Sequence, residues 1–408
     1  MHCPFRRITV NTKKLLAVLV AGACGAPLFA SAQNASPITV YGRLYPQFTV
    51  ISSNGATGTT GPRNTLSGAP TGVEIVTHNE VQASNSRLGF RGKEKLGGGL
   101  EAFFQIESTI PVDAGGGVFG SRDSFVGLSG GFGSVKLGNM DTVYKNYGDT
   151  LSFLGISSGN FVSNSNLLSK QGFGTSSSGS FHLRRNNSIV YDSPEMSGFE
   201  LSAGYSPDEG RTATRNANVV SIGGRYGGKK SPYFVAVAYE IHKDLFGGSN
   251  NVPAALSNAA NQGAHAKDKA VRFTGSYTIG NTTFEGNYAI LKYDETGGAT
   301  GRFQSYKHGA FNLAFAHTSG PWEIAGAYIS AGAGICTLIG GAACTTDGLK
   351  GQQFSIGSRY NFSKRNSAFL MYSKVKNDFA ARYNNLANGN PSSGSDLSHA
   401  ALGLQHAF

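Results

Sequence analysis

The stretch Ser398–Phe408 reads Ser-His-Ala-Ala-Leu-Gly-Leu-Gln-His-Ala-Phe. Leu402, Leu404 and Phe408 alternate with small or polar residues, and this period of two is typical of a β-strand. An unpaired strand edge invites aggregation in water and cannot be satisfied in a bilayer. We therefore expect this last strand to pair with the first strand of the chain and to close a barrel.

The amino-terminal residues predict export. Residues 1–14 carry four basic and no acidic side chains, residues 15–23 are apolar, and residues 30–32 are small. This order predicts a signal peptide over residues 1–32. A lipoprotein signal ending at Cys24 is the alternative, although the bulky aliphatic residue usual three positions upstream is missing. The apolar run is shorter than the ~20 residues that a membrane-spanning helix needs.

The remaining residues, 33–408, have an unusual composition. They hold 31 of the 35 basic residues and all 24 acidic residues, so the formal charge falls from +11 to +7. Charged residues make up 14% of the chain, against about 25% in ordinary soluble domains. The 57 glycines are about twice the usual share. We interpret residues 33–408 as one domain with a surface that faces lipid.

Sixteen segments alternate with period two and are separated by turn residues. They are residues 37–50, 80–94, 99–112, 121–129, 133–140, 184–193, 198–207, 217–227, 231–243, 268–279, 282–294, 302–317, 321–333, 351–361, 366–378 and 397–408. Short turns alternate with longer polar connections, as in outer-membrane barrels with an even strand count. The predicted fold is all-β, a 16-stranded antiparallel transmembrane β-barrel, and a barrel of this size leaves an aqueous channel.

Alternation also predicts which side chains face the lumen. Apolar residues of each strand are expected to face lipid, and polar residues are expected to face water. The predicted pore-lining residues are Arg43, Arg87, Arg91, Glu107, Arg122, Lys136, Arg184 and Arg185. Because rings of basic side chains favour anions, weak anion selectivity is predicted. For any single residue, an ion pair that only braces the wall is the alternative.

The connection over residues 141–183 is too long for an ordinary loop, and loops of this length are usually functional. We expect it to fold into the lumen as a constriction loop, with an outward surface flap as the alternative. Its charged residues are Asp141, Lys145, Asp149 and Lys170.

Cys336 and Cys344 lie eight residues apart in a glycine-rich segment, and in an exported protein they are predicted to form a disulfide. No histidine or acid lies between them, so neither a metal site nor a cofactor is predicted. His242, His265 and His308 are interpreted as solvated surface groups. Hydrolase and nucleotide-binding motifs are absent from the sequence, so an enzyme is not predicted unless its site is assembled from distant strands. No nucleic acid partner is predicted.

Several short motifs occur in order along the chain. They are Ile38–Gly42, Ser86–Leu100, Phe125–Ser129, Phe132–Val135, Arg185–Pro194, Tyr360–Arg365 and Leu404–Phe408. As a set they resemble the general porins of Gram-negative outer membranes, particularly those of the β-proteobacterial branch.

The resemblance implies a multi-pass barrel in the outer membrane, surrounded by lipid and lipopolysaccharide. It implies a homotrimer that allows passive diffusion of small hydrophilic solutes and anions, with the third loop folded inward. It also implies insertion by the outer-membrane assembly machinery through the strand ending in Phe408, and wall positions for Arg87, Arg122 and Arg185.

Two features depart from the family pattern. The long loop lacks the Pro-Glu-Phe-Gly-Gly type signature of enteric relatives, and Arg43 stands where an aliphatic or small residue is more usual. A substrate-specific channel is therefore an alternative, and a non-conducting structural or adhesive barrel is another.

Overall fold

The computed structural model describes residues 38–83, 85–148, 161–227, 231–386 and 390–408. The predicted signal peptide and Asp149 lie outside these residues. No helix in the described part of the chain is long and apolar enough to cross a bilayer.

The described residues form nineteen strand segments. They are β1 (Thr39–Leu44), β2 (Gln47–Asn54), β3 (His78–Gln82), β4 (Arg87–Gly97), β5 (Leu100–Thr109), β6 (Ser124–Gly130), β7 (Gly133–Asp141), β8 (Arg184–Asp192), β9 (Phe199–Pro207), β10 (Asn218–Tyr226), β11 (Tyr233–Lys243), β12 (His265–Ile279), β13 (Thr282–Thr296), β14 (Phe303–Ser319), β15 (Trp322–Ala331), β16 (Ile335–Leu338), β17 (Gly351–Asn361), β18 (Asn366–Asn377) and β19 (Asp396–Ala407). Two short helices, α2 (Val143–Gly148) and α3 (Ser165–Leu168), and a 3-10 turn over Ser177–Gly179 lie between β7 and β8.

Three barrel strands are each interrupted once, so the nineteen segments make sixteen antiparallel strands. The interrupted strands are β1 with β2, β3 with β4, and β15 with β16. Pro46 explains the first interruption, because its ring nitrogen has no hydrogen to donate to the hydrogen-bond ladder. Its carbonyl oxygen still accepts from the Leu404 amide at 3.1 Å. Each of the sixteen predicted strands overlaps one of these barrel strands.

The last strand closes the ring, as the sequence predicts. β19 pairs with β1 and β2, and β1 pairs in turn with β4. The Gly42 and Phe408 amides each donate to the other residue's carbonyl, at 3.0 and 3.1 Å. A Cβ at Gly42 would lie 2.4 Å from the Phe408 ring, so glycine is required for this close approach.

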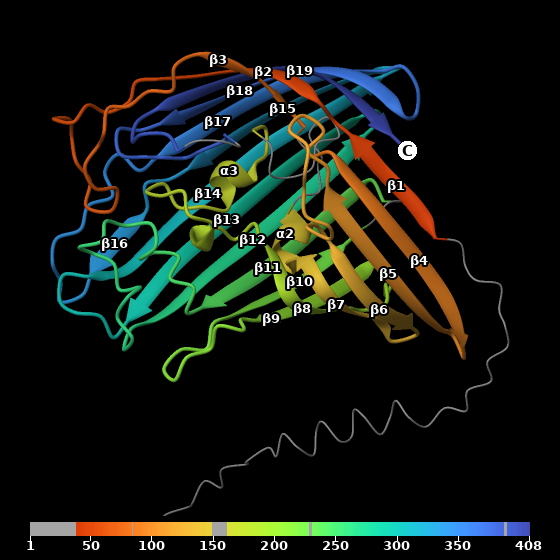
Figure 1. Cartoon of the computed structure of the whole chain (residues 1–408), viewed down its shortest axis with the longest axis horizontal. Coiled ribbons are helices and arrows are strands. Elements are labelled where there is room, and N and C mark those ends of the chain that lie inside the picture. The colour runs from red at the N-terminus through yellow and green to blue at the C-terminus, as the bar shows by residue number, and fades with distance from the viewer. Residues whose placement is uncertain (1–37, 84, 149–160, 228–230, 387–389) are drawn as a thin grey trace, which may run out of the picture. The chain divides into compact units, whose positions relative to one another are not determined.

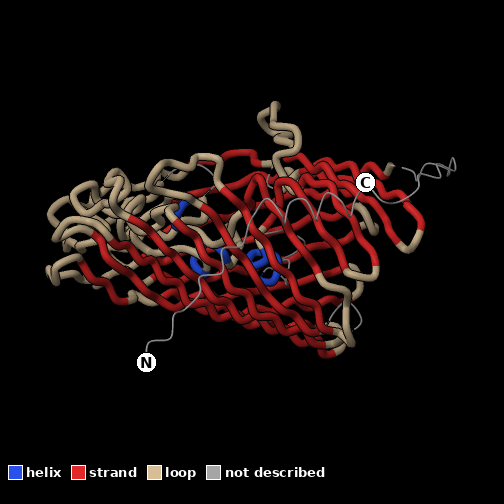
Figure 2. The backbone as a smooth tube through the Cα atoms, turned by 90° about the horizontal axis from the view of Figure 1, so that it is seen from below, coloured by secondary structure: helices blue, strands red, loops and turns tan. Residues whose placement is uncertain are grey.

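The strands have an apolar outer face and a polar inner face, which confirms the alternation argument. On β11, Tyr233, Val235 and Val237 are exposed, whereas Ala238 and Glu240 are buried. Exposed apolar side chains are expected where the barrel meets lipid. Figure 2 shows the strands from the side as tilted red tubes, with most of the long loops gathered at one end and shorter turns at the other.

Candidate functional site

The connection after β7 contacts the inner face of the wall. The Tyr144 amide donates to Ser221 Oγ at 2.9 Å, and the Tyr147 hydroxyl donates to Ser202 Oγ at 2.7 Å. Arg272, which is fully buried, donates to the carbonyl oxygen at the end of α2. These bonds join α2 to β9, β10 and β12, and Figure 1 shows both α2 and α3 within the ring of strands.

The second half of this connection is joined to other strands. The Gln353 amide donates to the Phe161 carbonyl at 3.1 Å, and the Phe161 ring stacks on His399 with centroids 4.1 Å apart. The Tyr293 hydroxyl donates to the Gly179 carbonyl at 2.5 Å. Such contacts are expected of a loop folded into the lumen and not of an outward flap.

A cavity of about 390 Å³ lies against the wall formed by β1, β4, β5, β7 and β8. Among the described residues, five arginines and three carboxylates line it, which gives these side chains a formal charge of +2. The charged lining residues are Arg43, Arg87, Arg91, Arg122, Arg184, Glu107, Asp123 and Asp141. Six of the predicted pore-lining residues, together with Asp141 of the predicted constriction loop, therefore meet in one place.

Glu107 is the centre of one group of charges. Its carboxylate lies 2.5 Å from Arg122 Nε and 3.8 Å from an Arg87 guanidinium nitrogen, and it accepts from the Tyr41 hydroxyl at 3.1 Å. Glu107 is 8% exposed. One carboxylate is shared between two guanidiniums, so this group keeps a surplus positive charge.

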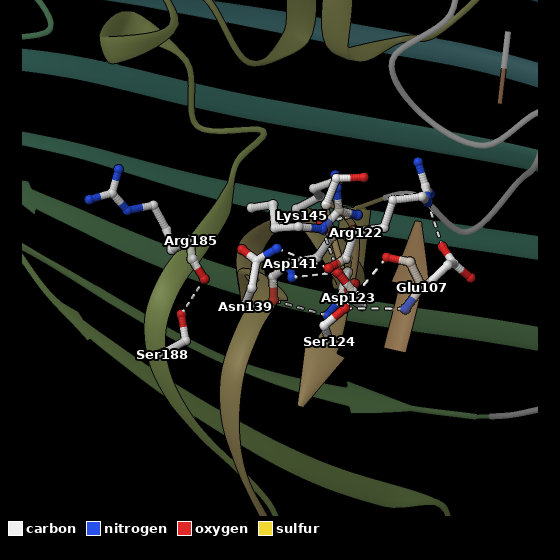
Figure 3. A network of polar contacts seen from close by, with 12 residues as sticks. Glu107, Arg122, Asp123, Ser124, Asn139, Asp141, Lys145, Arg185 and Ser188 are labelled. Carbon is white, nitrogen blue, oxygen red and sulfur yellow. Dashed lines mark hydrogen bonds and ion pairs between the residues drawn. The ribbon is translucent and has the colours of Figure 1, made fainter. Parts of the chain in front are cut away.

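Arg184 is the centre of the second group. Its guanidinium lies 2.6 Å from Asp123 Oδ1 and 2.8 Å from Asp141 Oδ1, and Lys145 Nζ also lies 2.8 Å from Asp141 Oδ1. Figure 3 shows Asp123, Asp141 and Lys145 gathered beside Arg122. Because Lys145 belongs to α2, these ion pairs connect the wall with the start of the long loop.

Arg43 and Arg91 reach the same cavity over aromatic rings. The Arg43 guanidinium lies 5.5 Å from the Tyr45 ring centroid, and that of Arg91 lies 5.0 Å from the Tyr41 ring centroid. Stacking of this kind holds a guanidinium in place while its charge is kept.

Two predicted pore-lining residues lie away from the cavity. Arg185 lies 3.9 Å from Asp208 and points away from the Arg122 group in Figure 3. Lys136 pairs with Asp192 at 2.7 Å.

Lys170 lines a separate cavity of about 430 Å³ with His182 and Arg382. Burial lowers the pKa of Lys170. The pKa of His182 is held well below its usual value, first by burial and second by the positive charge of Lys145. His182 therefore adds no positive charge at neutral pH.

The interpretation of two histidines as solvated groups is wrong. His242 and His308 are buried, and the His242 ring stacks on Phe181 with centroids 4.4 Å apart. Both histidines occupy inward positions of their strands, where the long loop covers them. His265 is exposed and lies 3.2 Å from Asp244.

Sequence reasoning missed Asp123, which pairs with Arg184. Its position beside Arg122, immediately before a strand, is the only signal that the sequence offers.

The structure joins Cys336 and Cys344 in a disulfide with Cα atoms 5.9 Å apart. Within the described residues, no group of three His, Cys, Asp or Glu side chains could hold a metal ion.

Known proteins share both the sequence pattern and the fold. A family model described as Gram-negative porin matches residues 16–380. Major outer membrane protein P.IB of Neisseria lactamica is 29% identical over 246 residues, which cover 53% of this chain and 68% of that protein. P.IB of Neisseria gonorrhoeae is 29% identical over 252 residues, covering 53% and 69%.

Two solved structures show the same fold. The anion-selective porin from Comamonas acidovorans has a TM-score of 0.66 at 23% identity, covering 91% of this chain and 100% of that one. OmpT of Vibrio cholerae has a TM-score of 0.61 at 13% identity, covering 93% and 99%. With the family match over most of its length and a closed barrel of sixteen strands, the chain belongs to the Gram-negative porins, which form channels in the outer membrane.

Proposed function

We propose that this porin allows passive diffusion of small hydrophilic solutes and ions with a weak preference for anions. The observation that supports this most strongly is the cavity with five arginines and three carboxylates. A positive lining raises the local concentration of anions and lowers that of cations. The solved anion-selective porin from Comamonas acidovorans, which shares the fold, adds support.

We propose a weak preference because carboxylates compensate much of the charge. Glu107, Asp123 and Asp141 each lie within 4 Å of at least one guanidinium. Lys145 of the long loop shares Asp141 with Arg184, because its Nζ also lies 2.8 Å from Asp141 Oδ1, so part of the positive charge remains.

In this account, Arg43, Arg87, Arg91, Arg122 and Arg184 set the field of the pore. Lys136 and Arg185 belong to the wall away from the cavity, and their effect on selectivity is expected to be smaller. The described residues of the connection 141–183 form the constriction loop in this proposal, and Asp149 lies outside the described residues.

The partners are part of the proposal. We infer a homotrimer, lipopolysaccharide around the outer half of the barrel, and insertion by the outer-membrane assembly machinery. One solved OmpT structure of similar fold is described as a trimer form. We infer no enzymatic activity, because channel formation accounts for the fold and for the arrangement of charges.

The test is the reversal potential of purified protein in planar bilayers under a salt gradient. Arg87→Gln with Arg122→Gln removes two positive charges and takes the cavity from +2 to zero. This double variant is expected to lose its anion preference. Lys364→Gln with Arg365→Gln is the matched control, because both residues are exposed in a short turn. Equal reversal potentials for the two double variants would contradict the proposal.

A substrate-specific channel is the second candidate. The 430 Å³ cavity is lined by Lys170, Arg382 and many hydroxyl and amide side chains, and no carboxylate is among the lining residues in the part of the chain that the structure describes. This chemistry suits a hydroxyl-rich anion such as a sugar phosphate. Concentration-dependent block of conductance by a sugar phosphate, but not by the parent sugar, would favour this candidate.

A further inference from the structure

One arginine is buried inside the barrel, away from the arginine-lined cavity. Arg272 lies on β12, is 1% exposed, and has one of the largest fully buried side chains in the described part of the chain. It is not one of the described residues that line the 390 Å³ cavity. A charged side chain is rarely buried unless partners compensate its charge, so the contacts of Arg272 indicate its role.

Arg272 joins two parts of the long loop to one point on the wall. Its guanidinium donates to the Gly148 carbonyl at the end of α2, and the same nitrogen lies 3.4 Å from Asn164 Oδ1, just before α3. On the wall side, its Nε donates to Asn287 Oδ1 at 3.0 Å. A planar guanidinium makes such bonds in several fixed directions at once, which a lysine ammonium cannot do.

Asn287 connects Arg272 with a buried carboxylate. The Asn287 amide donates to Glu285 Oε1 at 2.7 Å, and the Asn312 amide donates to the same oxygen at 3.3 Å. Glu285 is 3% exposed. Arg272 and Glu285 are therefore opposite charges linked through one amide group, and a satisfied polar network of this kind rigidifies its surroundings.

The contact between Gly148 and Arg272 leaves no room for a side chain. A Cβ at Gly148 would lie 2.2 Å from Nη1 and 2.4 Å from Nε of Arg272. The last carbonyl groups of a helix have no partner within the helix, and a cationic side chain can satisfy them. Glycine at the end of α2 therefore allows the guanidinium to reach the helix backbone.

The helix α2 connects this contact with the cavity. Lys145 lies in the last turn of α2, the turn that ends at Gly148. Its Nζ lies 2.8 Å from Asp141 Oδ1, and the same oxygen lies 2.8 Å from the Arg184 guanidinium. Asp141 and Arg184 both line the cavity. A displacement of the last turn of α2 would therefore move a positive charge relative to the cavity wall.

Two other hydrogen bonds hold α2 against the wall, and both join neutral groups. They are the bonds of the Tyr144 amide and of the Tyr147 hydroxyl to serine side chains. Hydrogen bonds with an ionised donor are roughly twice as strong as neutral ones. We therefore expect Arg272 to be the strongest of these three anchors.

We propose that Arg272 is a positioning residue for anion selectivity, which fixes the last turn of α2 and so keeps Lys145 on Asp141 beside the arginine-lined cavity. Arg272 acts through α2 and does not contact the permeating ion. The inference rests on the proposed anion preference, because the position of Lys145 matters for permeation only if the charges around the cavity select ions.

The first experiment records the reversal potential of the purified protein in planar bilayers under a potassium chloride gradient. Arg272→Gln is expected to lower the ratio of chloride to potassium permeability about twofold, the effect of losing one unit charge at about 8 Å in 0.1 M salt. Lys145→Gln removes that charge directly and is expected to lower the ratio at least as much. Because both changes act through one ion pair, adding Arg272→Gln to Lys145→Gln is expected to have no further effect.

Two further variants separate position from charge. Arg272→Lys keeps the charge but lacks the planar fork, and it is expected to lower the permeability ratio as Arg272→Gln does. Gly148→Ala places a Cβ against the guanidinium and is expected to have the same effect while Arg272 and its buried carboxylate are retained. Gly275→Ala on β12 is the matched control, because a Cβ there would meet neighbouring atoms only at 3.9 Å or more.

The second experiment measures the mobility of α2 without reference to ion selectivity. A nitroxide attached through Asn146→Cys lies on an exposed residue of α2. Under non-reducing conditions Cys336 and Cys344 stay in their disulfide and do not take the label. The label is expected to become more mobile in Arg272→Gln, Arg272→Lys and Gly148→Ala, and to be unchanged in Gly275→Ala.

Three results would overturn the proposal. They are an unchanged label spectrum in Arg272→Gln, full recovery of selectivity in Arg272→Lys, and additive effects of Arg272→Gln and Lys145→Gln. A lack of anion preference in the unmodified protein would contradict the proposed function, whereas a mobile label in Arg272→Gln would still support the positioning of α2 by Arg272. The two failures are therefore distinguishable.

Discussion

Replacing Glu107 by Gln is the sharpest perturbation of the cavity. The change removes the carboxylate shared by Arg87 and Arg122 and takes the cavity charge from +2 to +3. We expect the anion preference to increase, whereas neutralising any of the arginines that line the cavity is expected to decrease it.

The cavity size gives the magnitude. A sphere of about 390 Å³ has a radius near 4.5 Å, so an ion at its centre lies about 6 Å from a charge on the wall. In water, one unit charge at ~6 Å contributes about 0.7 kcal/mol, or about 0.4 kcal/mol with screening at 0.1 M salt. The local anion concentration should rise roughly two- to threefold, and the anion-to-cation ratio by roughly the square of that factor.

The assay is the reversal potential in planar bilayers under a tenfold gradient of potassium chloride, for which ideal selectivity gives about 59 mV. Glu101→Gln is the matched control, because it lies on the same strand but pairs with Lys93 at 3.2 Å, away from the cavity. A shift of Glu107→Gln toward cations, or equal shifts for Glu107→Gln and Glu101→Gln, would refute the reasoning.

Three more predictions concern single residues. Arg184→Gln should reduce anion preference in the same assay, and Arg185→Gln should change it less, because only Arg184 lines the cavity; the opposite order would contradict the site. Tyr147→Phe removes the hydrogen bond from the Tyr147 hydroxyl to Ser202 on the wall and should weaken the docking of the long loop by about 0.5–1.5 kcal/mol. The open-channel current should then fluctuate more, and unchanged current noise would argue against a role for this hydrogen bond in holding the loop. Cys336→Ser opens the disulfide-closed segment, which should lose about 2–3 kcal/mol of local stability and become sensitive to limited proteolysis while the conductance is unchanged; resistance equal to that of the unmodified protein would count against the prediction.

The barrel was predictable because its pattern is regular. Alternation with period two identifies the strands and the two faces, and the aromatic end of the last strand predicts closure. These features depend on local side-chain order, which the sequence shows directly.

The cavity was only partly predictable, because two strands break the alternation. The pairing of β7 with β8 shifts register between Gly138 and Met140, and Asn187 has a positive φ of 56°. Counting alternate residues therefore cannot separate Arg184 from Arg185. Asp123 was missed because it lies just before β6, outside the regular pattern.

The buried histidines needed tertiary information. His242 and His308 have inward parity, but only the position of the long loop decides whether an inward group faces water or protein. That loop contacts strands far away in sequence, as in the bond between Arg272 and Gly148, and such contacts leave no local signal.

The most direct test of the central claim is the reversal potential of the unmodified protein in a potassium chloride gradient, recorded with its single-channel conductance. The account predicts stepwise conductance and a reversal potential whose sign shows that chloride is more permeant than potassium. A protein that inserts without conducting, or a reversal potential of the opposite sign, would contradict the claim that a positively charged cavity controls a water-filled pore.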